Sequence, residues 1–281
     1  MSEAVLYDTV GPRGRRRILV GSIAGVLLVA VVLGAAVARL AAKGGLDPEL
    51  WRVLTQSAVQ RLILRGLVAT LQAALIAMVL AMLVGAVLAI GRLSQRAWVA
   101  KPAGAWVELF RGLPLLLLIL FLFLGLPALG VTVSVFWALV AGLTLYNSAV
   151  MGEIFRAGIL SLPKGQTEAA YSIGLRRGQT LQLILIPQAV RRMLPALISQ
   201  LVTLLKDTSL GFVIGYAELL RNGRGAVEFL GGRYSIPIYT AIAVVYIAVN
   251  ASLSFLARWL DRRTRHRIGR TVQPSVADEA A

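Results

Sequence analysis

Long runs without a charged residue constrain this chain more than any other feature. Residues 18–38 carry no charge, and neither do residues 113–151. An α-helix needs about 20 apolar residues to cross the hydrocarbon core of a bilayer. The first run fits one such helix, whereas the second is too long for one and contains the turn residues Gly125, Pro127 and Gly130. The pattern therefore predicts an all-α polytopic membrane protein.

Composition and charge agree with this class. The 281 residues are 58% hydrophobic and 15% charged, with 29 Lys and Arg against 13 Asp and Glu. In a soluble protein this basic surplus would suggest nucleic acid. Here the basic residues lie between apolar runs, so membrane lipid is the expected partner and nucleic acid is not. With no cysteine, and a single histidine (His266) that has no partners at metal-ligand spacing, we expect no disulfide, metal site or cofactor.

We expect six transmembrane helices. After the first run, spans are predicted at 67–90, twice within 113–151, at 193–217 and at 236–257. The sequence Ala36-Val37-Ala38 is similar to a signal-peptidase site, but the run before it is longer than the 7–15 residues or so of a signal peptide, which favours a retained anchor. The predicted segments are a basic cytoplasmic arm (1–17), an additional N-terminal membrane helix (18–41), an extracytoplasmic amphipathic segment that Asp47 begins as a helix cap (42–66), a core of five spans (67–260) with a coupling loop (159–192), and a basic cytoplasmic tail (261–281).

The basic residues also predict the orientation. With six spans, twenty Lys and Arg fall on the side of both termini and eight on the other side, while Lys206 lies within a span. Cytoplasmic loops of membrane proteins carry the excess of Lys and Arg. We therefore predict that the protein lies in the plasma membrane, with both termini and the polar loop at 161–188 in the cytoplasm.

The loop at 161–188 (SLPKGQTEAAYSIGLRRGQTLQLILIPQ) is long for a connection between spans. It predicts a short helix over 166–173, a left-handed end at Gly174 and a second short helix that ends near Pro187. Glu168 is placed in the first turn of the first helix, where a carboxylate suits the helix dipole. Glu168 then has either this local role or a role in docking another protein.

The spacing within this loop resembles the signature of the membrane subunits of ABC importers. That signature is Glu-Ala-Ala, three residues, Gly, nine residues, Ile, one residue and Leu-Pro, and Ile186 stands here in place of the Leu. Further stretches resemble the polar amino-acid permeases of the histidine, glutamine and glutamate type: 108–114 (ELFRGLP), 153–158 (EIFRAG), 163–165 (PKG), 187–189 (PQA) and 206–210 (KDTSL). The basic arm, the additional span and Tyr146-Asn147 are most similar to glutamate permeases of high-GC Gram-positive bacteria.

The resemblance implies the transmembrane subunit of a type I ABC importer for a polar amino acid, glutamate or glutamine. Its partners would be a dimer of ATPase subunits, a second permease that is identical or homologous, and an extracytoplasmic amino-acid-binding protein. The residues implied in ATPase coupling are Lys164, Gly165, Glu168, Ala169, Ala170 and Gly174. Those implied in the translocation path are Asn147, Lys206, Asp207, Thr208 and Ser209.

Lys206 and Asp207 are the charges within a predicted span. A charge inside a membrane is costly and usually faces the bundle interior or a wet cavity. Neighbouring helical residues point about 100° apart, so we expect the two side chains to reach different partners, with Asn147, Ser148 and Asn250 available on other spans. They either fix the packing of helices or line the path of a polar solute.

No nucleotide-hydrolysis motif is present, so we expect no enzyme activity in this chain and ATP hydrolysis by a partner. Two alternatives stay open. A secondary transporter or channel would take up its solute without an ATPase partner, and an assembly or regulatory protein would tolerate apolar replacements of Lys206 and Asp207.

Overall fold

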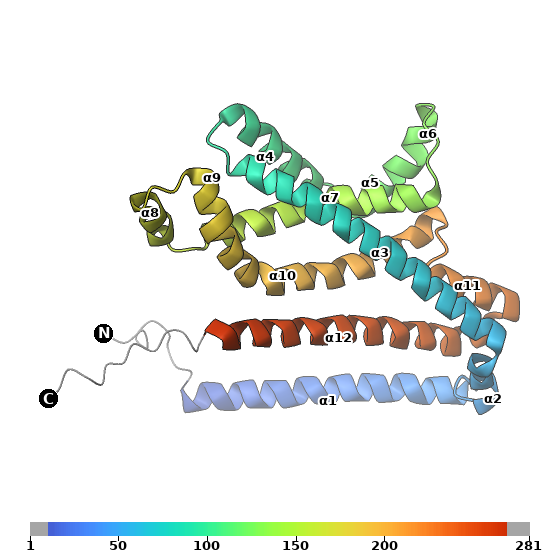
Figure 1. The fold of residues 1–281 in the computed structure, drawn as a ribbon. Coiled ribbons are helices and arrows are strands. Elements are labelled where there is room, and N and C mark those ends of the chain that lie inside the picture. The colour runs from blue at the N-terminus through green and yellow to red at the C-terminus, as the bar shows by residue number, and fades with distance from the viewer. Residues whose placement is uncertain (1–10, 269–281) are drawn as a thin grey trace.

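The computed structural model describes residues 11–268, without the side chains of 257, 258 and 260–268. Parts of the predicted arm (residues 1–10) and tail (residues 269–281), together with the side chain of His266, lie outside the described residues. Every regular element in the described range is helical (Figure 1). The helices are α1 (Pro12–Ala42), α2 (Pro48–Trp51), α3 (Ser57–Arg92), α4 (Ala97–Gly112), α5 (Leu115–Leu120), α6 (Leu126–Ala128), α7 (Val135–Leu160), α8 (Lys164–Ser172), α9 (Arg177–Gln179), α10 (Ile186–Asp207), α11 (Leu219–Leu230) and α12 (Ser235–Ile268).

Five helical segments among the described residues are long and apolar enough to cross a membrane. A sixth span results if the pair Ala97–Gly112 and Leu115–Ala128, bent by 101°, counts as one. The chain bends there because Leu113 precedes Pro114 and adopts the extended backbone that this position favours (ψ 135°). The bend therefore lies at the start of the third predicted span, between α4 and the segment Leu115–Ala128.

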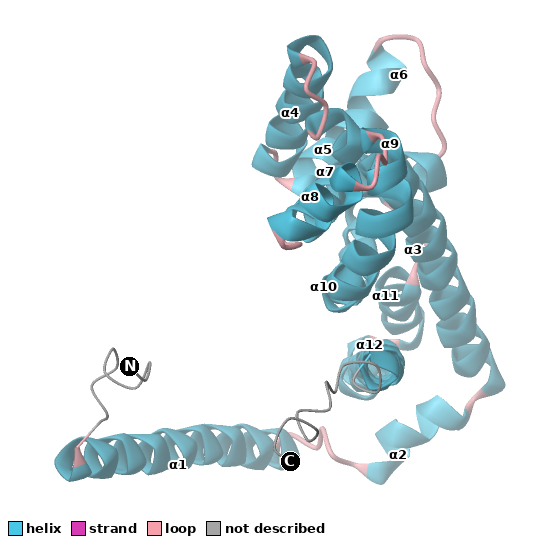
Figure 2. Ribbon diagram, turned by 60° about the vertical axis from the view of Figure 1, so that its left-hand side comes forward, coloured by secondary structure: helices cyan, strands magenta, loops and turns pink. Residues whose placement is uncertain are grey.

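α1 extends away from the other helices, as Figure 2 shows. None of its residues is buried. After Gly44, which has a positive φ of 72°, Asp47 caps α2 by accepting a hydrogen bond from the Glu49 N–H (3.0 Å), as predicted. The fold thus consists of a packed body from α2 onward and one helix that stands apart from it.

The body is built on the close packing of α3 against α7. Small residues line this contact, because a Cβ added at Gly85 would lie 2.7 Å from the Met151 Cβ and one added at Gly152 would lie 3.2 Å from the Leu88 Cβ. Ala77 and Ala81, both fully buried, extend the same stripe along α3. Small residues let two membrane helices approach closely, so this pair forms the rigid centre of the molecule.

The helical boundaries differ from expectation in three places. The helix that contains the second predicted span (67–90) begins earlier, at Ser57, and Val59 belongs to the same buried cluster as Leu219 and Ile238. The second short helix does not end near Pro187, since a π-helical segment (Thr180–Leu185) leads directly into α10, where the ring of Pro187 occupies the first turn.

The third correction concerns residues 218–235, which are predicted as an outer loop but contain α11. Gly223 does not break this helix; it allows α12 to approach, because a Cβ there would lie 1.8 Å from the Ile242 Cδ1. The helix ends at Gly231, whose φ of 107° suits glycine.

The two ends of the molecule differ. α8 and α9 lie at one end, together with the start of α1 and the end of α12, whereas α2, α6 and α11 lie at the other (Figure 1). α10 runs from the α8 end into the body.

Candidate coupling surface and polar pocket

α8 presents an exposed face at its end of the molecule. Lys164, Gly165, Glu168 and Ala169 are all exposed. The same surface continues to Ile173, which is 76% exposed although it is a large apolar residue. Tyr171, which is 48% exposed, adds a second large side chain at the end of α8, and neighbouring exposed apolar residues of this kind can mark a contact site.

The end of α8 has a defined geometry. Gly174 has a φ of 84°, as predicted. Its N–H donates to the Tyr171 carbonyl (2.9 Å), and the Leu175 N–H donates to the Ala170 carbonyl (3.1 Å). This is the Schellman pair of hydrogen bonds, which requires a left-handed residue and so favours glycine. The turn fixes Ile173 at the tip of the surface.

Two coupling residues lie differently from the prediction. Glu168 is not in the first turn, because α8 begins at Lys164 with Pro163 as its cap. Its exposed carboxylate is thereby removed from the helix N-terminus. Ala170 is 4% exposed and packs against the chain itself, so its small size serves the internal fit of α8 rather than an external contact.

Hydrogen bonds attach this loop to the rest of the chain. Gln188 on α10 donates from Nε2 to Gln166 Oε1 on α8 (3.2 Å). Arg192, also on α10, donates to the Ser161 carbonyl (2.7 Å) just before α8. These contacts join the coupling surface to the first turns of α10.

Charged residues join α3 and α7 at the same end of the molecule. Glu153 on α7 accepts hydrogen bonds from Arg92 on α3 and, at 3.2 Å and 2.5 Å, from Arg156 one turn further along α7. The predicted pairing of Glu153 with Arg156 is therefore confirmed, and it extends to a second helix.

The predicted path residues do not gather in one place. Asn147 is fully buried, and its Oδ1 accepts from Gln200 Nε2 of α10 (2.8 Å). Thr208 is also fully buried and donates to the Leu205 carbonyl (2.6 Å). Asp207 is half-buried. In this conformation Asn147 and Thr208 are buried within helix contacts, and neither lines the pocket between α10 and α12.

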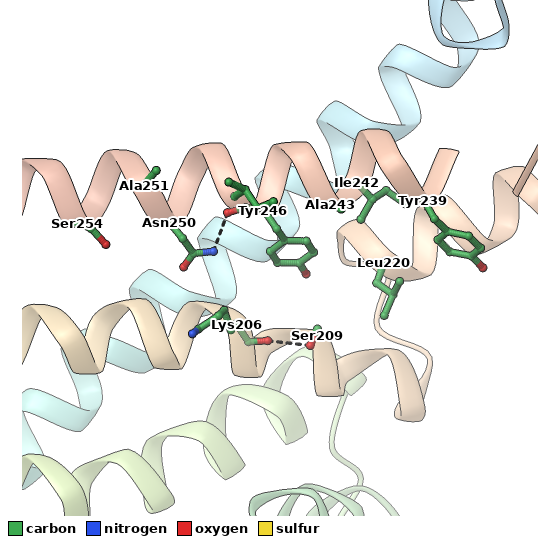
Figure 3. Close-up of a pocket in the computed structure, with 11 residues that line it drawn as sticks. Lys206, Ser209, Leu220, Tyr239, Ile242, Ala243, Tyr246, Asn250, Ala251 and Ser254 are labelled. Carbon is green, nitrogen blue, oxygen red and sulfur yellow. Dashed lines mark hydrogen bonds between the residues drawn. The ribbon is translucent and has the colours of Figure 1, made fainter. Parts of the chain in front are cut away.

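Lys206 and Ser209 instead line a pocket of about 680 Å³ between the end of α10, α11 and α12 (Figure 3). The α-helix ends at Asp207 and continues as a 3₁₀ helix (Thr208–Ile214), so Lys206 stands where the helix type changes. The other lining residues come mainly from α12: Leu220, Tyr239, Ile242, Ala243, Tyr246, Ile247, Asn250, Ala251 and Ser254.

A buried carboxylate lies behind this pocket. Glu218 is fully buried and caps α11 by accepting from the N–H groups of Leu220 (2.8 Å) and Arg221 (2.7 Å). It also accepts from the hydroxyl of Tyr246 (2.9 Å), a pocket residue. Burial raises the pKa of Glu218, and these three hydrogen bonds oppose that shift. The carboxylate thus orients both α11 and Tyr246.

Sequence reasoning missed Ile173, Glu218 and Tyr246. Ile173 was assigned only as the end of a helix, and its position directly before a C-terminal glycine was the available signal. Glu218 fell in a predicted loop, where a lone carboxylate carries no signal of burial. Tyr246 lies in an apolar span, and its hydroxyl was the available signal, because a buried tyrosine hydroxyl usually has a hydrogen-bond partner.

The fold and the site define a helical membrane protein with a short exposed helix at one end and a mostly apolar pocket between its spans. Residues 81–266 match the family of the binding-protein-dependent transport system inner membrane component. The chain belongs to this family.

Similar proteins agree with this assignment. The chain is 39% identical to a glutamate transport system permease protein of Corynebacterium glutamicum over 80% of its own length and 84% of that protein. It is 41% identical to a probable glutamine ABC transporter permease protein of Bacillus subtilis, over 70% and 91% of the two chains. An amino acid ABC transporter solved with histidines matches with a TM-score of 0.70 and 32% identity, covering 75% of this chain and 97% of that one. The type I ABC importer fold predicted from the sequence is confirmed.

Proposed function

We propose that this chain is the permease subunit of an ATP-driven importer for glutamate or glutamine, in a plasma membrane with α8 and both termini on the cytoplasmic side. Relatives named for these two amino acids support the substrate class. An extracytoplasmic binding protein would deliver the amino acid, and a second permease would complete the path.

The exposed face of α8 is the observation that carries this proposal. Lys164, Glu168, Ala169 and Ile173 would contact an ATPase subunit, with Ile173 as the apolar anchor. Such anchors in the centre of a contact supply most of its binding energy. The ATPase dimer would present two such sites, one for each permease.

α10 gives this contact a mechanical connection to the pocket. Its first turns are hydrogen-bonded to the α8 loop through Gln188 and Arg192, and its last turn carries Lys206. A displacement of α8 when the ATPase dimer closes would therefore move α10 as a unit and change the pocket at its other end. Closure of one element on another is a common form of switching between two states.

A matched pair of substitutions tests the docking surface. Ile173→Ser removes the exposed anchor, and we expect at least a tenfold loss of ATPase co-purification with the tagged permease from its native membrane. Leu183→Ser is the control, because Leu183 is 63% exposed in the same loop but lies outside α8. Equal ATPase recovery with wild type and Ile173→Ser would contradict the docking role, and ATP-independent uptake by the reconstituted chain alone would favour a secondary transporter.

A further inference from the structure

A second pocket lies at the α8 end of the molecule, where two spans meet the coupling loop. Its volume is about 600 Å³, within the range of ligand pockets, roughly 300–1,000 Å³. Four parts of the chain form its wall: the end of α3 with the turn to α4, the end of α7, α8, and the segment that leads from α9 into the π-helix. The pocket therefore joins elements that are far apart in the sequence.

The wall of this pocket is divided between apolar and polar groups. The apolar lining comes mainly from the ends of α3 and α7, with Ile90 and Leu160, and from the π-helical segment, with Leu181. The polar lining comes mainly from the α3–α4 turn, α8 and α9. A pocket that combines the two kinds of surface is suited to an amphiphilic ligand.

The charge of the wall is basic. Arg96 and Arg177 line the pocket, whereas no acidic residue of the described chain does, and the α8 carboxylate of Glu168 is not part of the wall. Arg177 Nη2 donates to the Leu93 carbonyl (2.6 Å), which holds its guanidinium beside the turn that carries Arg96. Neither arginine forms a salt bridge within the described residues. A guanidinium has five N–H donors in a geometry that matches a phosphate group, so these two favour a phosphate-bearing ligand.

The pocket lies where spans leave the membrane. Ile90 and Leu160 belong to the last turns of α3 and α7, which are both long and apolar enough to cross a bilayer. Trp98, which is 71% exposed, follows Arg96, whose guanidinium lies 5.9 Å from the centre of its ring. Tryptophan is enriched at the interface between membrane and water. These residues place the pocket at the level of the lipid headgroups.

We propose that this pocket binds one anionic phospholipid from the leaflet on the α8 side, with its phosphate at Arg96 and Arg177 and an acyl chain along Ile90 and Leu160. Basic pockets between membrane helices bind headgroups of this kind. The lipid would also contact α8, since Tyr171 lines the same pocket, and would thereby restrain the position of the coupling surface. This lipid site is independent of the proposed import function, because binding needs neither an ATPase nor an amino acid.

Native mass spectrometry of the full chain, purified in detergent, tests the site. The probes are dioleoylphosphatidylglycerol, which is anionic, and dioleoylphosphatidylcholine, which is zwitterionic. We expect wild type to bind the first molecule of the anionic lipid at least fivefold more tightly than the zwitterionic one. Arg96→Gln and Arg177→Gln should each weaken binding of the anionic lipid about fivefold, the effect expected of one basic residue at an anionic membrane surface.

Neighbouring basic residues provide matched controls. Arg176→Gln removes the charge next to Arg177, and Lys101→Gln removes one from α4; both residues are exposed and neither lines the pocket. These two variants should bind the anionic lipid as wild type does. Arg177→Lys keeps the charge and a donor for the Leu93 carbonyl, so it should bind within twofold of wild type. The unfolding temperature of each variant in the same detergent separates loss of binding from loss of folding.

A competition experiment separates a lipid from a soluble anion. Inorganic phosphate in large molar excess should leave the bound phosphatidylglycerol in place, and Leu160→Gln, a change at an exposed residue of the apolar wall, should weaken its binding at least threefold. Displacement by phosphate would assign the pocket to soluble anions and overturn the lipid site. Equal affinity of wild type for the two lipids, or equal losses in Arg176→Gln and Arg177→Gln, would overturn it as well.

Discussion

A single carboxylate, Glu218, joins three helices at the α11 end of the molecule. It caps α11, receives the Tyr246 hydroxyl from α12 and lies next to Leu219, whose N–H donates to Thr70 on α3 (3.1 Å). Removing one partner from a buried hydrogen-bonded set leaves the others unsatisfied, at a cost of about 1–3 kcal/mol for each group. Local sequence patterns indicate none of these long-range contacts.

At this position we predict that Glu218→Leu lowers the free energy of unfolding of the purified chain by about 2–4 kcal/mol, through the lost cap and the unpaired tyrosine hydroxyl. Glu218→Gln keeps an acceptor and should cost less. Glu228→Leu on the same helix removes only an exposed ion pair with Arg224 and should change stability by less than about 1 kcal/mol. Thermal unfolding in detergent measures all three, and equal losses for Glu218→Leu and Glu228→Leu would refute the role of the buried network.

The close packing of the helices α3 and α7 depends on small residues at their contact. At Gly85 an added Cβ would lie 2.7 Å from the Met151 Cβ and 3.0 Å from the Ser148 carbonyl oxygen, so even alanine forces the helices apart. Overpacking of this kind costs about 1–3 kcal/mol. We predict that Gly85→Ala lowers the unfolding temperature. Gly104→Ala on α4, where nothing lies within 4 Å of the added atom, should leave it unchanged or raise it, and the reverse order would contradict the close packing.

The elements predicted correctly are those whose position depends on residues that are close together in the sequence. The uncharged run at 18–38 indicated α1, Asp47-Pro48 indicated the start of α2, and Gly174 indicated the end of α8. α11 was not predicted, because a glycine such as Gly223 occurs both in loops and in close contacts between helices, and the sequence does not distinguish the two. In the candidate site, the spacing indicated α8 and Lys206, whereas the hydrogen bond from the Tyr246 hydroxyl on α12 to Glu218 joins residues 28 positions apart and has no local signal.

The connection between the two ends is a property of the whole molecule. α8 lies at the end that holds the start of α1 and the end of α12, α11 lies at the opposite end, and α10 links the docking face to the pocket (Figure 1). This arrangement serves import only if the α8 end faces the cytoplasm, where ATP is available. The orientation is therefore a premise of the proposed function.

The absence of cysteine from the natural sequence allows a direct test of that orientation. Lys101→Cys places an exposed thiol on α4 at the α8 end, and Glu228→Cys places one on α11 at the other end. A membrane-impermeant maleimide added to intact cells should label Glu228→Cys and leave Lys101→Cys unlabelled until the membrane is opened. The wild-type chain, without a thiol, gives the background. Labelling of Lys101→Cys from outside would show that the α8 end faces the outside, where no ATP is available to an ATPase. The twenty Lys and Arg predicted to face the cytoplasm would then also lie on the wrong side.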